Sequence, residues 1–239
     1  MALKLYLEDS YRRTFDGEVA AAAEGWCALS QTAFYPGGGG QPEDRGRLEV
    51  GGESLGVDAV REDGAGEVWH HLGRDLAPGT LVHGEIDWPW RYALMRAHAL
   101  MHVVNTVARD WLGGVITGVQ LGLGRSRIDF KLPRFGRELI PELEGRVNAV
   151  LARGLPIASS TVSEEEFLRR PELVRTAEVR PPVVAGRVRV VEIGGFDAQA
   201  CGGTHVHTTR EVGRARVVKF DNKGRDNKRF YWELDAPLE

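Results

Sequence analysis

The first 87 residues of the chain alternate between apolar and polar positions in short runs that turn residues interrupt. Apolar residues at every second position lie on one face of a β-strand, so each run predicts a strand with one buried face. Glycine-containing pairs such as Asp16-Gly17, Gly51-Gly52 and Asp63-Gly64 mark turns between the runs. Strands at this spacing predict a small β-barrel or sandwich, and we take the barrel as the expected fold. The expected strands are Leu3–Leu7, Gly17–Ala21, Trp26–Gln31, Arg47–Val50, Leu55–Val60, Val68–His71 and Leu81–Ile86.

The pattern changes at Asp87-Trp-Pro-Trp90, where an acidic residue and an early proline are typical of a helix start. From Tyr92 to Leu112 the chain has no glycine or proline, and apolar residues recur at helical spacing. Gly113-Gly114 then ends the predicted helix. We therefore expect two domains, residues 1–87 and residues 88–239.

The second domain mixes both types of pattern, which predicts an α+β fold with helices against an antiparallel sheet. A helix is expected over Glu138–Arg153, and Ser163-Glu-Glu-Glu166 has the capping-box pattern of a short helix start. The expected strands are Val119–Leu132 (two strands with a turn at 122–124), Pro156–Val162, Arg187–Ile193, Val212–Phe220 and Arg229–Leu234.

The composition is that of an ordinary soluble protein. Of 239 residues, 42% are hydrophobic and 27% charged, and no apolar run reaches the length of a membrane span. The N-terminus lacks the apolar segment of a signal peptide. Two cysteines in so long a chain do not form a disulfide framework, so we expect a reducing, cytoplasmic protein that does not bind membranes, with Cys27 as a buried free thiol.

Two short segments carry side chains suited to a metal ion. His98-Ala-Leu-Met-His102 places two imidazoles on one helix face, because residues i and i+4 are neighbours there. Cys201-Gly-Gly-Thr-His205 adds a thiolate and a third imidazole on a flexible turn. Three nitrogens and one sulfur suit Zn²⁺ by ligand type and number.

The ligand types alone do not decide between a catalytic and a structural metal. Four protein ligands close a tetrahedral site, whereas catalytic zinc usually keeps one position open. A histidine on a helix is also commonly an ordinary buried residue. Position 99 is Ala, so the glutamate of the His-Glu-x-x-His metalloprotease motif is absent and a peptidase is disfavoured.

The formal net charge of −3 gives no general sign of nucleic-acid binding, but basic residues are clustered. One cluster comprises Arg125, Arg127, Lys131, Arg134 and Arg137. The other comprises Arg214, Arg216, Lys219, Lys223, Arg225, Lys228 and Arg229, among which only two acidic residues occur. Such clusters can contact phosphates even in an acidic protein, although a solvated surface gives the same pattern.

Four consecutive glycines occupy positions 37–40, followed by Gln41. Ordering such a run costs backbone entropy. It indicates either a flexible hairpin loop or a backbone that must approach a ligand or another domain closely. No Lys-Ser or Lys-Thr follows, so it is not a nucleotide-binding loop.

Taken together and in order, three motifs resemble the alanyl-tRNA editing family, the freestanding relatives of the editing domain of alanyl-tRNA synthetase often called AlaX. They are Phe34-Tyr-Pro-Gly-Gly-Gly-Gly-Gln41 with Asp44 and Gly46, His98-x3-His102, and Asp197-Ala-Gln-Ala-Cys-Gly-Gly-Thr-His205. Thr209-Arg-Glu-Val-Gly213 and the segment 223–229 also look like the family. The resemblance covers nearly the whole chain and matches the medium-length form.

The resemblance implies a hydrolase that removes a wrongly attached amino acid, mainly serine and sometimes glycine, from alanine tRNA without ATP. It implies a zinc-dependent editing domain over residues 88–239, of the type called the second additional domain in threonyl- and alanyl-tRNA synthetases. By residue-level match, the zinc ligands are His98, His102, Cys201 and His205; the substrate-binding residues are Gln199, Thr204, Gly38, Gly39, Gly40 and Gln41.

One departure concerns the first histidine motif, in which the family commonly has Thr directly after the first histidine. Here position 99 is Ala, which has no hydroxyl for a serine substrate. Asp197 and Glu192 are weaker candidates for direct chemistry, and His207 for contact with RNA. We expect the remaining histidines, at positions 70, 71 and 83, to be structural.

Two other functions share these features. A structural-zinc RNA-binding module would bind tRNA and leave the ester intact. A zinc amidase or esterase for a small metabolite would not need the basic clusters. In the editing hydrolase, zinc can polarise the ester carbonyl, lower the pKa of a nearby water, or anchor the amino acid.

Overall fold

The computed structural model describes residues 2–174, 183–184 and 186–235. The chain divides into two compact units, Met1–Leu94 and Met95–Glu239, and the division falls inside one long helix, α2 (Trp88–Leu112). This helix begins where the sequence predicts a start, one residue after Asp87. The sequence predicts domain limits of 1–87 and 88–239, and these limits remain a prediction, because the two compact units describe contacts rather than domains.

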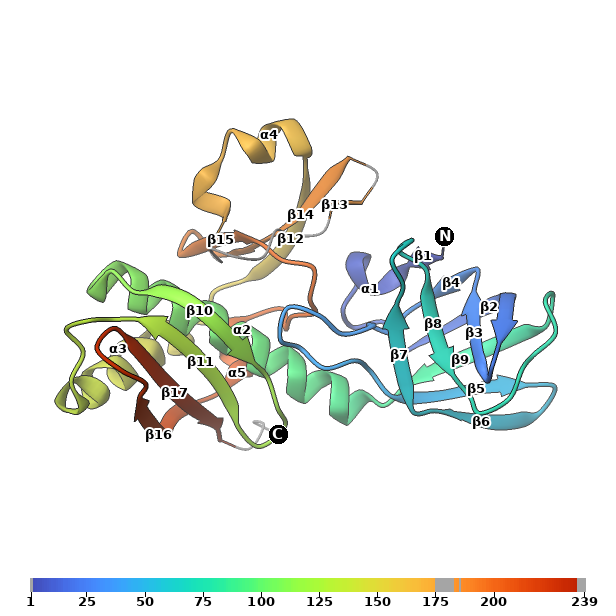
Figure 1. The fold of residues 1–239 in the computed structure, drawn as a ribbon, viewed down its shortest axis with the longest axis horizontal. Helices are drawn as coiled ribbons and strands as arrows, with labels where there is room; N and C mark the ends of the chain where they lie inside the picture. The colour runs from blue at the N-terminus through green and yellow to red at the C-terminus, as the bar shows by residue number, and fades with distance from the viewer. Residues whose placement is uncertain (1, 175–182, 185, 236–239) are drawn as a thin grey trace. The chain divides into compact units, whose positions relative to one another are not determined.

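The first unit is built on one antiparallel sheet of seven strands in the order β6-β5-β9-β2-β3-β8-β7 (Figure 1). Its strands are β2 (Thr14–Ala23), β3 (Trp26–Leu29), β5 (Gly46–Val50), β6 (Glu53–Val57), β7 (Ala59–Glu62), β8 (Val68–His71) and β9 (Leu81–Ile86). A short parallel pair, β1 (Leu3–Lys4) with β4 (Gln31–Thr32), accompanies it. Leu29, Leu48 and Val68 are fully buried in the apolar core of this unit.

The predicted β-barrel is confirmed only in part, as an antiparallel sheet. β2 belongs to both halves of this sheet, since its first residues pair with β9 and its last with β3 across a bulge at Val19/Ala21. The two edge strands, β6 and β7, are separated in the chain by Asp58 alone. Among the described residues no pairing joins these edges, so closure of a barrel by hydrogen bonds is not confirmed.

The prediction of a strand over Leu3–Leu7 is wrong for most of its length. Only Leu3–Lys4 is extended, and α1 (Leu5–Glu8) is a single helical turn. The reason is burial, because the consecutive residues Leu5 and Tyr6 are both buried, whereas successive residues of a strand face opposite sides. Tyr6 packs edge-on against Tyr35, with ring centroids 5.5 Å apart.

The second unit confirms the predicted mixture of helices and antiparallel strands. Its helices are α2, α3 (Ile140–Ala152), α4 (Glu164–Leu168) and α5 (Thr209–Val212), with 3₁₀ turns η1 (Arg137–Leu139) and η2 (Pro171–Leu173). Its strands are β10 (Val115–Gln120), β11 (Ser126–Lys131), β12 (Ile157–Ser163), β13 (Val183–Val184), β14 (Arg187–Ile193), β15 (Asp197–Ala200), β16 (Ala215–Asn222) and β17 (Asn227–Leu234). No helix among the described residues has the length and apolar character needed to cross a membrane.

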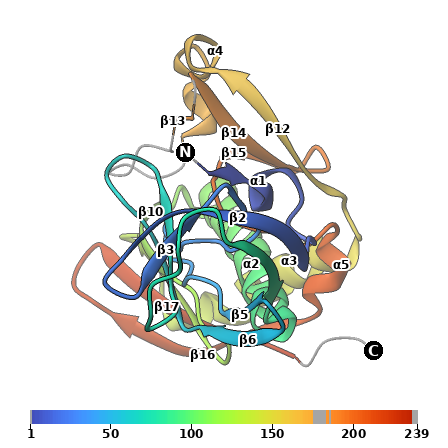
Figure 2. The same cartoon turned by 90° about the vertical axis from the view of Figure 1, so that its right-hand side faces the viewer.

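These strands form two sheets. One has the order β10-β11-β17-β16, and α3 bonds to its edge strand through Asn148, whose side chain hydrogen-bonds both the amide and the carbonyl of Ala215. The other joins β12, β14 and β13, with β15 paired to β14, and α4 packs on it as a small separate group (Figures 1 and 2). As predicted, the Ser163 hydroxyl caps α4 by accepting a hydrogen bond from the Glu166 amide at 3.0 Å.

Candidate metal site

Four side chains from two distant parts of the second unit meet at one place. His98 and His102 lie one turn apart on α2, and Cys201 and His205 lie on the turn that follows β15. Their four candidate ligand atoms all lie within 4.8 Å of one another. The three histidines are buried, and Cys201 is partly exposed. The structure thus brings together the two pairs that the sequence singled out.

Three of the separations between these atoms are close to those of a tetrahedral zinc site. The Nε2 atoms of His102 and His205 are 3.2 Å apart, and Sγ of Cys201 lies 3.5 Å from Nε2 of His98 and 3.9 Å from Nε2 of His205. With metal–nitrogen and metal–sulfur bonds of about 2.0 and 2.3 Å, tetrahedral donors are about 3.3 to 3.6 Å apart. The donor set therefore fits a metal ion of the zinc type.

Arg189, which was not predicted as a site residue, holds the turn that carries Cys201. Its Nη1 donates hydrogen bonds to the carbonyl oxygens of Cys201 and Gly203, both at 2.9 Å. The Cys201 amide in turn donates to the Arg189 carbonyl at 3.1 Å. An arginine at an alternating position of a predicted strand gives no local signal for this contact, which links residues 12 and 14 positions apart.

Burial favours the uncharged form of every side chain in the cluster. Desolvation lowers the pKa of His102 to about 3, and desolvation together with neighbouring charges lowers the pKa values of His98 and His205 well below the ordinary value. Desolvation likewise raises the pKa of the Cys201 thiol. The imidazoles thus present unprotonated nitrogens at neutral pH, as a metal ligand must.

A buried carboxylate, that of Asp197, lies on the Nδ1 side of the His102 ring. The Asp197 side chain is fully buried, and its Oδ2 accepts a hydrogen bond from the Gln199 amide at 2.5 Å. Burial raises the pKa of Asp197, although the hydrogen bond from Gln199 opposes the shift. Gln199, a predicted substrate residue, thus donates its side-chain amide to Asp197. Thr204, another predicted substrate residue, is fully buried.

The glycine-rich segment lies in the first unit as an ordered turn. The Gly38 amide bonds to the Gln41 carbonyl at 3.0 Å, and the Gln41 amide bonds back to Gly38 at 2.9 Å. Gly37 has φ +82°, a backbone conformation that residues with a side chain rarely adopt. A Cβ there would also lie only 3.2 Å from the Glu43 amide nitrogen. Gln41 is buried, with 2% of its surface exposed.

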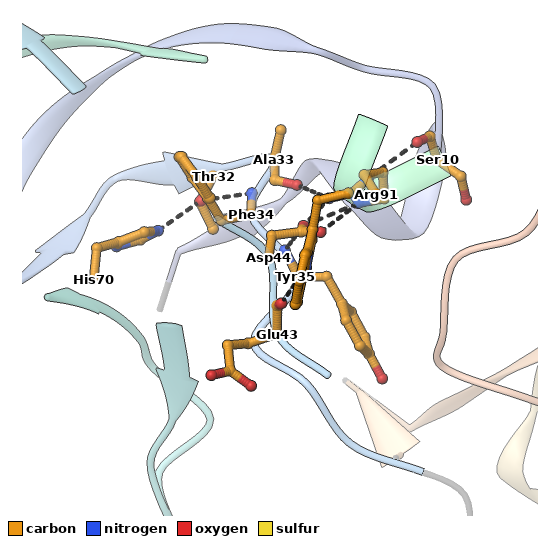
Figure 3. Close-up of polar contacts among 10 residues, drawn as sticks. Ser10, Thr32, Ala33, Phe34, Tyr35, Glu43, Asp44, His70 and Arg91 are labelled. Atoms are coloured by element: carbon orange, nitrogen blue, oxygen red, sulfur yellow. Dashed lines mark hydrogen bonds and ion pairs between the residues drawn. The ribbon is translucent and has the colours of Figure 1, made fainter. Parts of the chain in front are cut away.

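A buried ion pair holds the base of this turn (Figure 3). Nε of Arg91, in the first turn of α2, donates to both carboxylate oxygens of Asp44 at 2.8 and 2.9 Å, and neither side chain is exposed. Arg91 also donates to the carbonyls of Ser10 and Ala33, and the Tyr35 amide donates to Asp44 at 2.6 Å. Asp44 of the family motif thus has a structural role that spacing alone did not reveal.

The predicted RNA-binding residues do not form a uniform basic surface. Lys228 is buried, and its Nζ donates to Asn222 Oδ1 and to the carbonyls of Gly224 and Arg225 at 2.8 to 3.1 Å. Its inclusion among surface residues was wrong, because it shares the inward face of β17 with Phe230 and Trp232. The exposed members are Arg214, Arg216, Lys219, Lys223 and Arg225, while Arg229 is half-buried.

Of the remaining histidines, those at positions 70, 71 and 83 lie far from the cluster in the sequence, whereas His207 follows His205 by two residues. His70 is buried and bonds to Thr32 Oγ1 and to the Cys27 carbonyl, while His71 and His83 contact Asp58 and Asp16. His207 is exposed. Cys27 is a buried free thiol, as expected.

Comparison with known families matches both parts of the chain. Residues 7–90 match the family described as tRNA synthetases class II (A). Residues 188–231 match the Threonyl and Alanyl tRNA synthetase second additional domain. The second match contains Cys201 and His205.

Individual relatives extend the similarity over nearly the full length. An Alanyl-tRNA editing protein AlaX-M of Methanosarcina barkeri is 36% identical, covering 98% of this chain and 99% of the relative. The AlaX-M protein of Saccharolobus solfataricus is 35% identical with the same coverage. The alanine–tRNA ligase of Pyrococcus furiosus is 36% identical over 91% of this chain, which corresponds to 24% of the ligase. The chain therefore belongs to the AlaX-M family of alanyl-tRNA editing proteins.

Proposed function

We propose that this chain hydrolyses the ester bond between alanine tRNA and a wrongly attached amino acid, with serine as the main substrate and glycine as a second. Water adds across the ester, which yields the free amino acid and a tRNA with its terminal hydroxyl restored, so ATP is not required. The observation that carries the proposal is the meeting of His98, His102, Cys201 and His205 in a chain whose relatives are named editing proteins.

In this proposal the four side chains hold Zn²⁺. Bound there, Zn²⁺ supplies Lewis-acid chemistry, by polarising the ester carbonyl or activating a water, or else anchors the amino acid. The histidines bind as neutral imidazoles, which their burial favours. Arg189 keeps Cys201 in place through the two carbonyl contacts of its turn.

A second candidate is a structural-zinc module that binds tRNA without hydrolysing it. The number of protein donors favours it, since four ligands fill a tetrahedral site. Direct catalysis by the metal would instead require that one ligand exchange with water or substrate. Cys201 is partly exposed, whereas the three histidines are buried.

The decisive experiment incubates the purified chain with alanine tRNA charged with serine, glycine or alanine and follows loss of each ester. Zinc-dependent release of serine or glycine, with the alanine ester spared, is expected. A chelated sample and the His98→Ala/His102→Ala variant should lose this release, whereas His71→Ala/His83→Ala, which alters two half-exposed histidines of the first unit, serves as the matched control. If all three esters survive while tRNA still binds, the structural-zinc module replaces the hydrolase.

A further inference from the structure

The β10-β11-β17-β16 sheet has an apolar face and a polar face. On the first, Ile128, Phe130, Phe230 and Trp232 are almost fully buried. The residues between them in β11 and β17 point the other way, because side chains alternate along a strand. In Figure 1 this sheet lies with α3 behind it.

Two rows of residues cross this polar face in register. The first row is Gln120, Arg127, Tyr231 and Lys219, one residue from each strand. The second row is Gly118, Asp129, Arg229 and Asp221. Tyr231 is thus the aromatic residue of the first row, on an inner strand, with a basic residue on each neighbouring strand.

The cations beside Tyr231 approach its ring. The Arg125 guanidinium carbon and the Lys219 Nζ each lie over the ring, 5.0 Å from its centroid, so a base that stacks on Tyr231 would displace one of these two exposed side chains. Arg127 pairs directly with Tyr231 across the β11–β17 ladder. RNA-binding sheets stack bases on aromatic side chains, and single-stranded nucleic acids are commonly bound where such rings lie beside positively charged groups.

The balance of charge on this face is opposite to that of the chain. Seven basic residues and three acidic ones lie there, so its formal charge is +4, whereas the whole chain carries −3. The basic residues are Arg125, Arg127, Lys131, Arg216, Lys219, Lys223 and Arg229, and the acidic residues are Asp129, Asp221 and Glu233. An acidic chain that concentrates positive charge around one aromatic side chain has a surface complementary to a polyanion.

Salt bridges show which of these cations are already engaged. Arg229 forms two hydrogen bonds of 2.8 Å to Asp129, and Lys219 contacts Asp221 at 3.1 Å. Arg125 and Arg127 form no hydrogen bond to a carboxylate among the described residues; Arg127 Nε comes no closer than 3.9 Å to Asp129. These two guanidinium groups are therefore among the cations left available to phosphates, as is Lys223, whose Nζ comes no closer than 3.9 Å to Asp221.

We propose that this face binds RNA, with an unpaired base stacked on Tyr231 and the flanking phosphates contacted by Arg125 and Arg127. The inference rests on the proposed function only in taking the RNA to be alanine tRNA. It differs from the two basic clusters found in the sequence, because it assigns no contact to Lys228 and joins the aromatic ring of Tyr231 to Arg125 and Arg127 of the first cluster.

The test measures binding of uncharged alanine tRNA to the full chain at several salt concentrations. Tyr231→Ala should weaken binding about 5- to 150-fold, the range for loss of one base–aromatic stack, while Tyr231→Phe, which keeps the ring, should stay within about twofold. Arg125→Ala/Arg127→Ala should reduce the slope of log K against log salt by about 1.4 to 1.8, since each phosphate contact contributes about 0.7 to 0.9. Arg169→Ala, on the distant small group, is the control, since that side chain is exposed and pairs only within α4 among the described contacts, at 3.6 Å to Glu165.

Three results would overturn the inference: a Tyr231→Ala variant that binds as the parent does, a Tyr231→Phe variant that loses as much affinity as Tyr231→Ala, or an unchanged salt slope in the double arginine variant. Because the RNA carries no amino acid, the readout does not depend on hydrolysis. A chain that binds through Tyr231 but spares every ester would refute the proposed hydrolase and leave this surface intact.

Discussion

Oδ2 of Asp197 lies 3.9 Å from Nδ1 of His102, and both side chains are buried. The Nδ1 atom of His102 has no hydrogen-bond partner among the described residues, while Nε2 of the same ring faces His205. A histidine that binds a metal through one nitrogen commonly donates a hydrogen bond through the other to a carboxylate, which orients the ring. Asp197 is placed to orient His102 in this way.

Replacing Asp197 by Asn keeps the shape of the side chain and removes its charge. We expect Asp197→Asn to weaken Zn²⁺ binding by about 10- to 100-fold, the usual effect of losing such a partner. Competition with a chromophoric chelator measures the affinity directly. Glu192→Gln, an exposed carboxylate on the neighbouring strand β14, is the matched control. Equal affinities in the two variants would rule out an orienting role for Asp197.

Zinc uptake should release about one proton near neutral pH. The raised pKa of the Cys201 thiol keeps it protonated before the metal binds, so ligation must displace that proton. The three histidines contribute none, because their pKa values are lowered and they are already neutral. Calorimetry in buffers of different ionisation enthalpy counts the protons. Release of two or more would mean that histidines are protonated in the metal-free protein.

Breaking the Arg91–Asp44 pair should destabilise the first unit strongly. Asp44→Asn leaves a fully buried guanidinium without its counter-ion, which typically costs about 3 to 5 kcal/mol. Urea unfolding measures the loss. Glu142→Gln, which breaks the exposed pair with Arg146, should cost less than about 1 kcal/mol. Similar losses in both variants would contradict the structural role assigned to Asp44.

The sequence predicted those parts of the site whose signals are local. The four-residue spacing of His98 and His102 defines a helix face, and α2 begins one residue after Asp87, at the predicted start. The contact between the two ligand pairs joins residues 103 positions apart, and only their complementary ligand types and the family resemblance connected them beforehand. Arg189 and Arg91 were missed because their partners are backbone carbonyls or distant carboxylates, which leave no periodic pattern.

Two of the other errors had signals that could have been read. Thr208-Thr-Arg-Glu211 has the capping-box pattern, and in the structure Thr208 and Glu211 cap α5, which was not predicted. Extending the alternation of β17 backward from Trp232 and Phe230 places Lys228 on the inward face, where the structure has it. Counting charges without this alternation made Lys228 look like a surface residue.

Acid should destabilise the first unit through His70 (Figure 3). Burial lowers its pKa from 6.5 to about 4. Above pH 6.5 the ring is neutral in both states and its contribution is complete. As the pH falls from 6.5 to 4 the unfolded state takes up a proton first, so up to about 3 kcal/mol of stability is lost, with no further loss below 4.

The check is the pH dependence of urea unfolding for His70→Gln. This variant should lose less stability than the parent between pH 6.5 and 4, whatever its stability at pH 7. His83→Gln, which alters a partly exposed histidine paired with Asp16, controls for the loss of a histidine as such. Parallel curves for all three proteins would show that His70 does not titrate differently on unfolding.

The residue after His98 offers a test of amino-acid choice, given the proposed function. Ala99 is fully buried and lacks the hydroxyl that the family commonly has at this position. We expect Ala99→Thr to raise the ratio of serine release to glycine release, since a hydroxyl can hydrogen-bond the serine side chain and gives nothing to glycine. Ala99→Val has nearly the same volume without the hydroxyl, so it separates hydrogen bonding from crowding. Competition assays with both charged tRNAs give the ratio directly. If Thr and Val change it equally, packing around α2 rather than a hydrogen bond sets the preference at this position.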